Sequence, residues 1–240
     1  MVNLILTGAA GRMGQAILSV LPGFRNLQLA GAVGAIGHPN IGKSIYKGVK
    51  LTGDLSSIIK DGDVVIDFTG AESSVTNLKI AASAKKPVVI GSTGHDSNQR
   101  AELVSLSKKI PIVCSPNMSV GVNTMWKLIE MTTLALGKNY QIDIVETHHI
   151  HKKDAPSGTA KKMLEIVAEA GGHSSVKSIR EGEVVGDHTI IFTSPYERLE
   201  ITHRAFSREV FAVGALRAAE WVIGKPAGLY DIGDVLNISA

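Results

Sequence analysis

The stretch Val2-Asn3-Leu4-Ile5-Leu6-Thr7-Gly8-Ala9-Ala10-Gly11-Arg12-Met13-Gly14 decides the fold of this chain. A short apolar strand runs directly into a glycine-rich turn, and the residues after the turn predict a helix. Glycines let such a turn approach a pyrophosphate, and the following helix points its N–H groups and the positive end of its dipole at that charge. The stretch therefore predicts a dinucleotide-binding unit, with a tight turn that binds no nucleotide as the alternative.

The chain up to residue 116 alternates short β-branched runs with segments of helical period, which is typical of βαβ units around a parallel sheet. Strands are predicted at 2–6, 27–33, 64–68, 88–90 and 112–114. Helices are predicted over 72–84 and from Ser97, which is expected to act as the N-cap of its helix. We therefore expect an α/β fold with a Rossmann-like parallel-sheet domain over residues 1–118.

The pattern changes after residue 118. A long helix is predicted over 122–136 with Gly137 as its C-cap, then a strand over 141–147 and a helix over 158–170 with Ser157 as its N-cap. Strands at 176–180, 188–193 and 198–203 follow without helices between them, which predicts an antiparallel or mixed sheet. A second, α+β domain is thus expected over 119–208, and an apolar helix at 209–223 is expected to return the chain to the first domain, which 209–240 would complete.

The residue after the second predicted strand bears on which dinucleotide is bound. An Asp or Glu usually stands there and bonds the adenosine ribose 2′-hydroxyl, but this chain has Gly34, and no acidic residue occurs before Asp54. A 2′-phosphate would meet no carboxylate, and Arg12 or Lys43 would lie near it. We therefore expect NADPH to be preferred over NADH.

Two further turns follow predicted parallel strands, namely Gly91-Ser92-Thr93-Gly94 and Ser115-Pro116-Asn117-Met118. Ligands of open α/β sheets lie beyond the carboxyl ends of the strands, so both turns are candidates to line a nicotinamide pocket. Taken separately, each is ordinary loop sequence.

The densest run of chemically active residues is Glu146-Thr147-His148-His149-Ile150-His151-Lys152-Lys153-Asp154-Ala155-Pro156-Ser157-Gly158-Thr159. Cationic side chains followed by a helix N-terminus indicate a site for an anion, such as a small substrate with one or two carboxylates. A histidine there can also transfer a proton near neutral pH. The alternatives are a solvated basic loop and a metal site, and the flanking lysines oppose a cation, so no metal is expected.

This run closely resembles the signature of bacterial dihydrodipicolinate reductases, enzymes of the diaminopimelate pathway of lysine biosynthesis. Other segments resemble family landmarks in family order: Gly8 to Gly14, Ile66-Asp67-Phe68-Thr69, Val89 to Gly94, Asn117 to Asn123 and Arg198 to His203. The resemblance spans the chain, and it implies reduction of 4-hydroxy-tetrahydrodipicolinate to tetrahydrodipicolinate by NADPH or NADH. It also implies a homotetramer built by the second domain.

The resemblance assigns roles by position. It makes His148 the proton donor and acceptor and Lys152 a second proton donor. It implies that His149, Ser157, Gly158 and Thr159 hold the carboxylates of a small cyclic dicarboxylate. It assigns NAD(P)H contacts to Gly8, Ala9, Ala10, Gly11, Arg12, Met13, Gly91, Ser92, Thr93, Ser115, Pro116, Asn117 and Met118.

Composition limits the other classes of function. The 240 residues carry a net charge of +3, with 5% aromatic residues and a single cysteine, Cys114. No stacking platform accompanies the basic residues, so a nucleic-acid partner is not expected. The sequence indicates no signal peptide, membrane span or disulfide, which favours a soluble, cytoplasmic protein. The remaining rivals are a dehydrogenase of another amino-acid-derived acid and a module that senses NAD(P) without chemistry.

Overall fold

The computed structural model describes residues 1–238, which form two compact units. The first unit combines Met1–Met118 with Phe211–Asn237, and the second consists mainly of Ser119–Val210. The chain thus leaves the first unit once and comes back to it near its end.

The first unit contains an eight-stranded sheet with the strand order β12-β7-β6-β5-β1-β2-β4-β3. All neighbours pair in parallel except β3 and β4, which are antiparallel. The order reverses between β1 and β5, so a crevice is expected at the carboxyl ends of these two strands. The strands are β1 (Val2–Thr7), β2 (Leu27–Val33), β3 (Ser44–Tyr46), β4 (Val49–Thr52), β5 (Val64–Asp67), β6 (Val88–Ile90), β7 (Pro111–Cys114) and β12 (Gly228–Tyr230).

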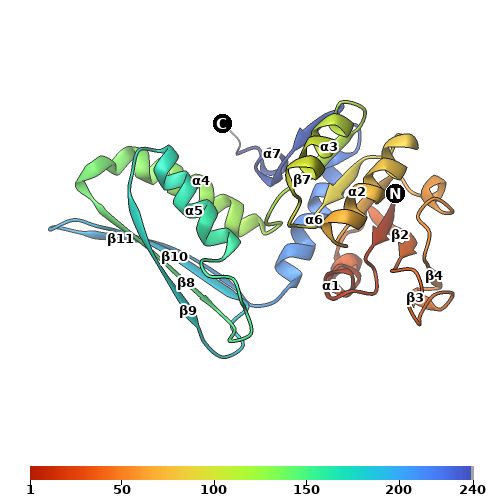
Figure 1. Ribbon diagram of the computed structural model, residues 1–240, viewed down its shortest axis with the longest axis horizontal. Coiled ribbons are helices and arrows are strands. Elements are labelled where there is room, and N and C mark those ends of the chain that lie inside the picture. Colours follow the sequence, from red (N-terminus) through yellow and green to blue (C-terminus); the bar gives the residue numbers. More distant parts are fainter. Residues whose placement is uncertain (239–240) are drawn as a thin grey trace. The chain divides into compact units, whose positions relative to one another are not determined.

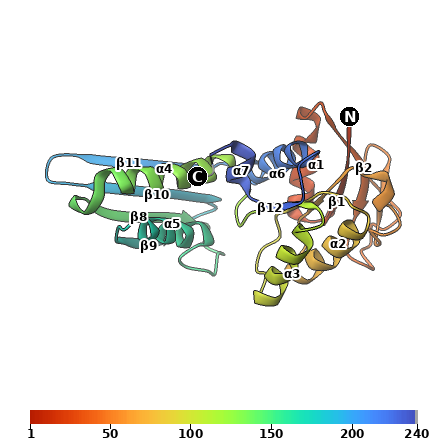
Figure 2. The same ribbon diagram turned by 90° about the horizontal axis from the view of Figure 1, so that it is seen from above.

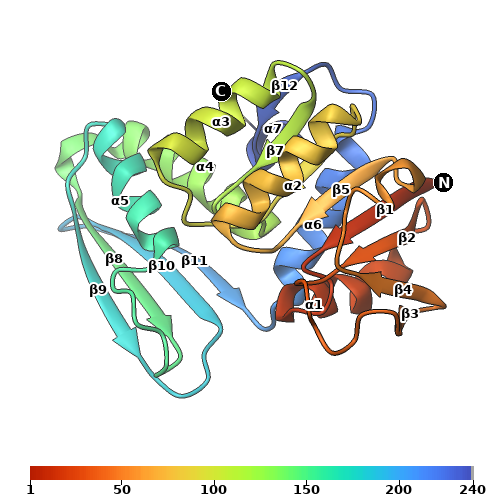
Figure 3. The same cartoon turned by 45° about the vertical axis from the view of Figure 1, so that its right-hand side comes forward.

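Helices cover both faces of this sheet, so its central strands are apolar on both sides (Figure 3). Leu4 and Leu6 of β1 face one layer of helices, whereas Ile5 faces the other. The first layer contains α1 (Arg12–Val20), α6 (Glu209–Val222) and α7 (Ile232–Leu236), and the second contains α2 (Ala71–Ser83) and α3 (Ser97–Ser107).

The second unit is a four-stranded mixed sheet with the order β11-β10-β8-β9. Its helices α4 and α5 lie together on one face (Figures 1 and 2). Because side chains alternate along a strand, even-numbered residues of β8 and β10 pack beneath the helices and odd-numbered ones point away. The elements are α4 (Val120–Leu136), β8 (Gln141–His148), α5 (Gly158–Glu169), β9 (Ser174–Arg180), β10 (Gly186–Thr193) and β11 (Arg198–Ala205).

The structure confirms the expected α/β class, the parallel sheet and the mixed second sheet. One prediction was wrong: the N-cap of α3 is Asp96, not Ser97. The Asp96 carboxylate accepts the Gln99 N–H at 2.8 Å, and the Gln99 side chain accepts the Asp96 N–H at 2.9 Å, a reciprocal pair that a serine one residue later would not form. Within residues 1–238 no helix is both long enough and apolar enough to span a membrane.

Candidate functional site

The turn between β1 and α1 needs its glycines for steric reasons. Gly8 has a φ of +75°, and a Cβ there would lie 2.3 Å from the carbonyl oxygen of Phe68. A Cβ on Gly14 would lie 2.3 Å from the Gly8 oxygen. The turn therefore packs tightly against β5, and α1 begins after Gly11, which has no side chain to cap the helix.

A cavity of about 830 Å³ opens beside this turn, at the point where the strand order reverses. Every segment that follows β1, β2, β4 or β5 contributes to it, together with one side of α2. Its lining residues are Gly8, Ala10, Gly11, Val33, Gly34, Ala35, Ile36, His38, Gly53, Asp54, Leu55, Phe68, Thr69, Gly70, Glu72, Ser73, Thr76, Asn77 and Ile80.

The residues present fit a dinucleotide. The N-terminus of α1 and the glycine turn supply a pyrophosphate cradle, and Gly34, Ala35 and Ile36 leave an uncharged wall after β2. The cavity brings together three of the predicted cofactor residues, Gly8, Ala10 and Gly11.

The other predicted cofactor residues do not line this cavity. Ala9 is fully buried in the core, Met13 packs against that core, and neither Arg12 nor Lys43 is among the lining residues. The turns at 91–93 and 115–118 follow β6 and β7, further along the same edge of the sheet. In the second of these turns, the Ser115 hydroxyl donates to the Asn117 carbonyl at 2.8 Å.

Asp54 is a cavity residue that the sequence did not single out. It follows β4, which pairs in parallel with β2, so it comes to the same sheet edge as Gly34 although the two are far apart in the chain. The Asp54 carboxylate accepts the Ser56 N–H and hydroxyl at 2.8 and 2.7 Å, and these hydrogen bonds lower its pKa. Asp54 could have been identified only from the pairing of β2 with β4, and the sequence did not predict β4.

A buried carboxylate, Asp67, holds the loops at this edge together. It accepts hydrogen bonds from the Thr7 hydroxyl (2.6 Å), the Ser92 hydroxyl (2.6 Å) and the Asn77 side-chain amide (2.8 Å). The Thr69 hydroxyl adds a fourth at 2.9 Å. One side chain thus ties the ends of β1, β5 and β6 to α2, and this explains the position of Ser92 in the second predicted turn.

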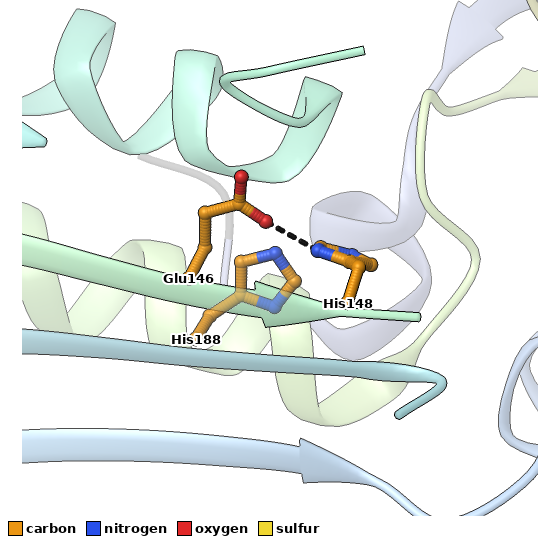
Figure 4. Close-up of side chains that lie close together, drawn as sticks. All are labelled: Glu146, His148 and His188. Carbon is orange, nitrogen blue, oxygen red and sulfur yellow. Dashed lines mark hydrogen bonds and ion pairs between the residues drawn. The ribbon is translucent and has the colours of Figure 1, made fainter. Parts of the chain in front are cut away.

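The second unit carries a buried pair of titratable side chains on β8. Glu146 and His148 stand two residues apart and therefore point to the same face, beneath the helices. Both are buried, and His148 Nδ1 is hydrogen-bonded to the Glu146 carboxylate (Figure 4). The His188 ring, from β10, meets the His148 ring edge-on at a centroid distance of 5.0 Å.

The electrostatics of this pair keep Glu146 ionised and His148 neutral near pH 7. Burial alone would raise the pKa of Glu146, but hydrogen bonds from Ser178 and Arg180 and the neighbouring His148 lower it overall. Burial lowers the pKa of His148, and Lys152 and Arg180 lower it further, against the opposing effect of Glu146. Burial, with His148 nearby, lowers the pKa of His188 to about 3.

Arg180, at the end of β9, joins this pair to the basic loop. Its Nη2 lies 3.0 Å from Glu146 Oε1, and the same group donates to the Asp154 carbonyl. Its Nε donates to the Lys152 carbonyl at 3.2 Å. Sequence reasoning missed Arg180 and His188, because β9 and β10 reach β8 only through pairing between strands distant in sequence.

The basic loop after β8 holds the remaining predicted residues. The Lys152 ammonium lies 2.8 Å from Asp154 and holds the pKa of that carboxyl below its usual range. The His149 N–H donates to the Val184 carbonyl at 2.7 Å, and its Nδ1 is buried without a hydrogen-bond partner in the structure.

The loop ends at the N-terminus of α5. The Ser157 hydroxyl accepts the Ala160 N–H at 3.2 Å and lies 3.2 Å from His188 Nε2. Gly158 and Thr159 form the first turn of the helix, whose dipole favours an anion. Predicted residues His148, Ser157, Gly158 and Thr159 are thus assembled around one end of the second sheet.

Glu146, His148 and His188 offer possible metal-ligand atoms within 4.8 Å of one another. However, Glu146 is already bonded to Arg180 and to His148, and the Arg180 and Lys152 cations oppose a metal ion. The arrangement is suited to proton transfer and anion binding.

Comparisons with known proteins identify the family. A model described as "Dihydrodipicolinate reductase, N-terminus" matches residues 2–118, and "Dihydrodipicolinate reductase, C-terminus" matches 121–236. Among curated relatives, the 4-hydroxy-tetrahydrodipicolinate reductase of Syntrophus aciditrophicus is 42% identical, covering 99% of each chain. The enzyme of that name from Geobacter sulfurreducens is 41% identical, covering 99% of this chain and 100% of the relative.

Solved structures agree with this result at the level of the fold. A dipicolinate-bound dihydrodipicolinate reductase from Paenisporosarcina sp. TG-14 has a TM-score of 0.82 at 22% identity, covering 96% of this chain and 97% of its own. A probable dehydrogenase from Thermotoga maritima has a TM-score of 0.67 at 12% identity, covering 98% and 93%. With both halves matched by family models and close relatives over its whole length, this chain belongs to the dihydrodipicolinate reductase family.

Proposed function

We propose that the end of the second sheet, with the basic loop and the start of α5, is where this chain carries out its family's reaction. That reaction is the NAD(P)H-dependent reduction of 4-hydroxy-tetrahydrodipicolinate to tetrahydrodipicolinate in the diaminopimelate pathway of lysine biosynthesis, and the chain is an oxidoreductase of this kind. The observation that carries the proposal is the pairing of a buried, hydrogen-bonded histidine with an anion-binding helix terminus.

The substrate carboxylates are assigned to the start of α5. Ser157, Gly158 and Thr159 lie where the helix dipole favours negative charge, and the unpartnered Nδ1 of His149 offers a further donor. The related enzyme solved with dipicolinate, a planar ring with two carboxylates, supports a ligand of this class.

The proton steps are assigned to His148 and Lys152. When bound, NAD(P)H would supply a hydride to the substrate ring, and with one proton the 4-hydroxyl group of the substrate leaves as water. His148 is held by Glu146 with one ring nitrogen left for proton exchange, and it acts as proton donor and acceptor. Lys152, held beside Asp154 as an ammonium, acts as the second proton donor.

The test compares Lys152→Ala with Lys153→Ala. Lys153 is the adjacent, exposed lysine, so its variant removes the same charge from the same loop. We expect Lys152→Ala to lower kcat about 100-fold with the KM for NADPH unchanged, and Lys153→Ala to change kcat less than threefold. Equal kcat values for the two variants would show that Lys152 has no special role.

We also propose that the turns Gly8–Met13, Gly91–Thr93 and Ser115–Met118 bind NAD(P)H and that NADPH is preferred. Within the first turn, Gly8, Ala10 and Gly11 line the cavity, whereas Ala9 supports them from the core. Gly34 leaves the wall after β2 uncharged. Of the two carboxylates that line the cavity, Asp54 is already engaged by Ser56 and Glu72 lies in the first turn of α2. The test is the ratio of kcat/KM for NADPH and NADH in the wild type and in Asp54→Asn. A ratio that favours NADH in the wild type and reverses in Asp54→Asn would assign ribose recognition to Asp54.

We propose a homotetramer that assembles through the face of the second sheet that no helix covers (Figure 1). The helices lie on the other face, and this one carries partly exposed Val145, Thr147, Thr189 and Ile191. Sheet faces of this kind are suited to pack against a second copy. Sedimentation of the wild type and of Ile191→Lys tests the assignment, because a buried lysine at the interface should dissociate the assembly.

We propose the cytoplasm as the place of action. The single cysteine, Cys114, lies in β7, and burial raises the pKa of its thiol to about 11, so it stays protonated and unreactive. Cell fractionation with an antibody to the chain would test this assignment.

A further inference from the structure

We propose that Glu146 is a positioning residue that fixes which nitrogen of His148 carries the exchangeable proton. The inference rests on the proposed role of His148. A carboxylate only accepts hydrogen bonds, so the contact between Glu146 and His148 Nδ1 requires the proton on Nδ1. Nε2 is then the nitrogen that exchanges a proton with the substrate.

The surroundings hold the His148 ring in this orientation. The His188 ring packs edge-on against it, and a Cβ at Gly186 would lie 3.0 Å from Nε2. The glycine thus leaves space beside the nitrogen that exchanges the proton, while the opposite side of the ring is tied to Glu146.

Arg180 determines which oxygen of the Glu146 carboxylate bonds to His148. The Arg180 Nη2 atom lies 3.0 Å from Glu146 Oε1 and forms an ion pair with it, so Glu146 Oε2 is the oxygen that bonds to His148. The same arginine bonds the carbonyls of Lys152 and Asp154 in the basic loop. Glu146 therefore links two groups with proposed roles in proton transfer, His148 directly and Lys152 through Arg180. The charged or titratable side chains that face His148 are Glu146, Lys152, Asp154, Arg180 and His188.

The decisive variant is Glu146→Gln, which keeps the shape of the side chain. Arg180 can only donate, so the amide oxygen of the glutamine has to face it. The amide NH₂ group then faces His148 Nδ1, which has to accept, and the ring proton moves to Nε2. We expect kcat to fall about 100-fold, because the wrong nitrogen is protonated, with both KM values changed less than threefold.

The matched control is Asp143→Asn on the same strand. Asp143 points to the opposite face, where it accepts hydrogen bonds from Gln141 (2.8 Å) and Ser175 (2.6 Å). This variant makes the same chemical change in β8 without touching His148. We expect kcat to stay within threefold of the wild type.

The test reads the protonation of His148 directly, by ¹⁵N NMR of histidine-labelled protein at pH 8, with His148→Gln used to assign the signal. We expect the Nδ1–H form in the wild type and in Asp143→Asn, and the Nε2–H form in Glu146→Gln.

An Nε2–H form of His148 in the wild type would overturn the proposal even if Glu146→Gln did not fold. A lowered kcat with an unchanged Nδ1–H signal would also overturn it, and full activity of His148→Gln would instead refute the proposed function.

Discussion

The two units each bury a carboxylate at the end of a strand, and the two carboxylates have opposite kinds of partner. Asp67 is surrounded by hydroxyl and amide donors that do not titrate near neutral pH. Glu146 is bonded to a histidine and an arginine, with a lysine nearby. The first network is suited to hold loops in place and the second to hold and move protons, so the partners of a buried acid reveal its role better than its burial does.

Asp67→Asn should have the largest effect on stability. The asparagine amide would face donors such as the Asn77 amide and the Thr69 N–H, which leaves at least one buried donor without an acceptor. We expect the free energy of unfolding to fall by about 3 kcal/mol. Urea unfolding followed by circular dichroism measures it.

The control for this prediction is Asp63→Asn. Asp63 is exposed, and among residues 1–238 its carboxylate accepts a single hydrogen bond, from the Asn3 N–H at 2.8 Å. The Asp63→Asn substitution should lower the free energy of unfolding by less than about 1 kcal/mol. A similar loss in both variants would mean that the Asp67 network stabilises the first unit no more than a surface contact does.

Acid should lower the free energy of unfolding of the second unit, because the buried His188 resists protonation in the folded chain. Its pKa is about 3 in the folded chain against an ordinary value of 6.5, so below pH 6.5 the unfolded chain binds a proton that the folded chain does not. Stability is therefore retained above pH 6.5 and lost as the pH falls from 6.5 toward 3, by about 2 kcal/mol at pH 5. Urea unfolding at pH 7 and pH 5 should show this loss in the wild type. The loss in His188→Gln should be smaller by about 2 kcal/mol, with the lowered pKa of His148 still contributing to what remains.

The matched control is His173→Gln, which removes an exposed histidine from the same unit. Its stability should depend on pH as that of the wild type does. If His188→Gln also kept the full wild-type dependence, burial of His188 would not be its cause.

The smallest predicted effect compares two helix N-caps, one in each unit. Asp96→Ala and Ser157→Ala each remove one capping hydrogen bond, and each should lower stability by about 1 kcal/mol. Only Ser157→Ala should also raise the KM for substrate, by about tenfold, because Ser157 is proposed to bind a carboxylate. Thermal unfolding and steady-state kinetics measure the two effects, and equal KM values would remove Ser157 from the substrate site.

Local patterns predicted most of the fold. The apolar runs gave the central strands, and Ser157 and Gly137 marked ends of long helices correctly. The short strands β3, β4 and β12 were missed because polar residues or glycine interrupt them, whereas the equally short β6 is a continuous apolar run. Asp96 was missed as the cap of α3 because its neighbour Ser97 is an equally good capping residue.

The proposed site was predicted where its residues are adjacent in sequence and missed where strand pairing assembles it. His148, Lys152 and Ser157 lie in one run and were found together. Arg180 and His188 reach His148 only through the registers of β9 and β10 on β8. Asp54 likewise reaches the cavity through β4 beside β2. The alternation of Glu146 and His148 on one strand was the available signal that these two side chains share a face.

The return of the chain to the first unit has a consequence for synthesis on the ribosome. Helix α6 buries Gly214 against Met118, where a Cβ would lie 1.7 Å from the Met118 oxygen, and β12 adds the strand beside β7. Neither element can be completed until the ribosome has passed Val210, and Ser119–Val210 has by then been synthesised. The inserted unit is therefore available to fold before the first unit is complete, because one face of the N-terminal sheet stays partly uncovered until Phe211–Asn237 has emerged.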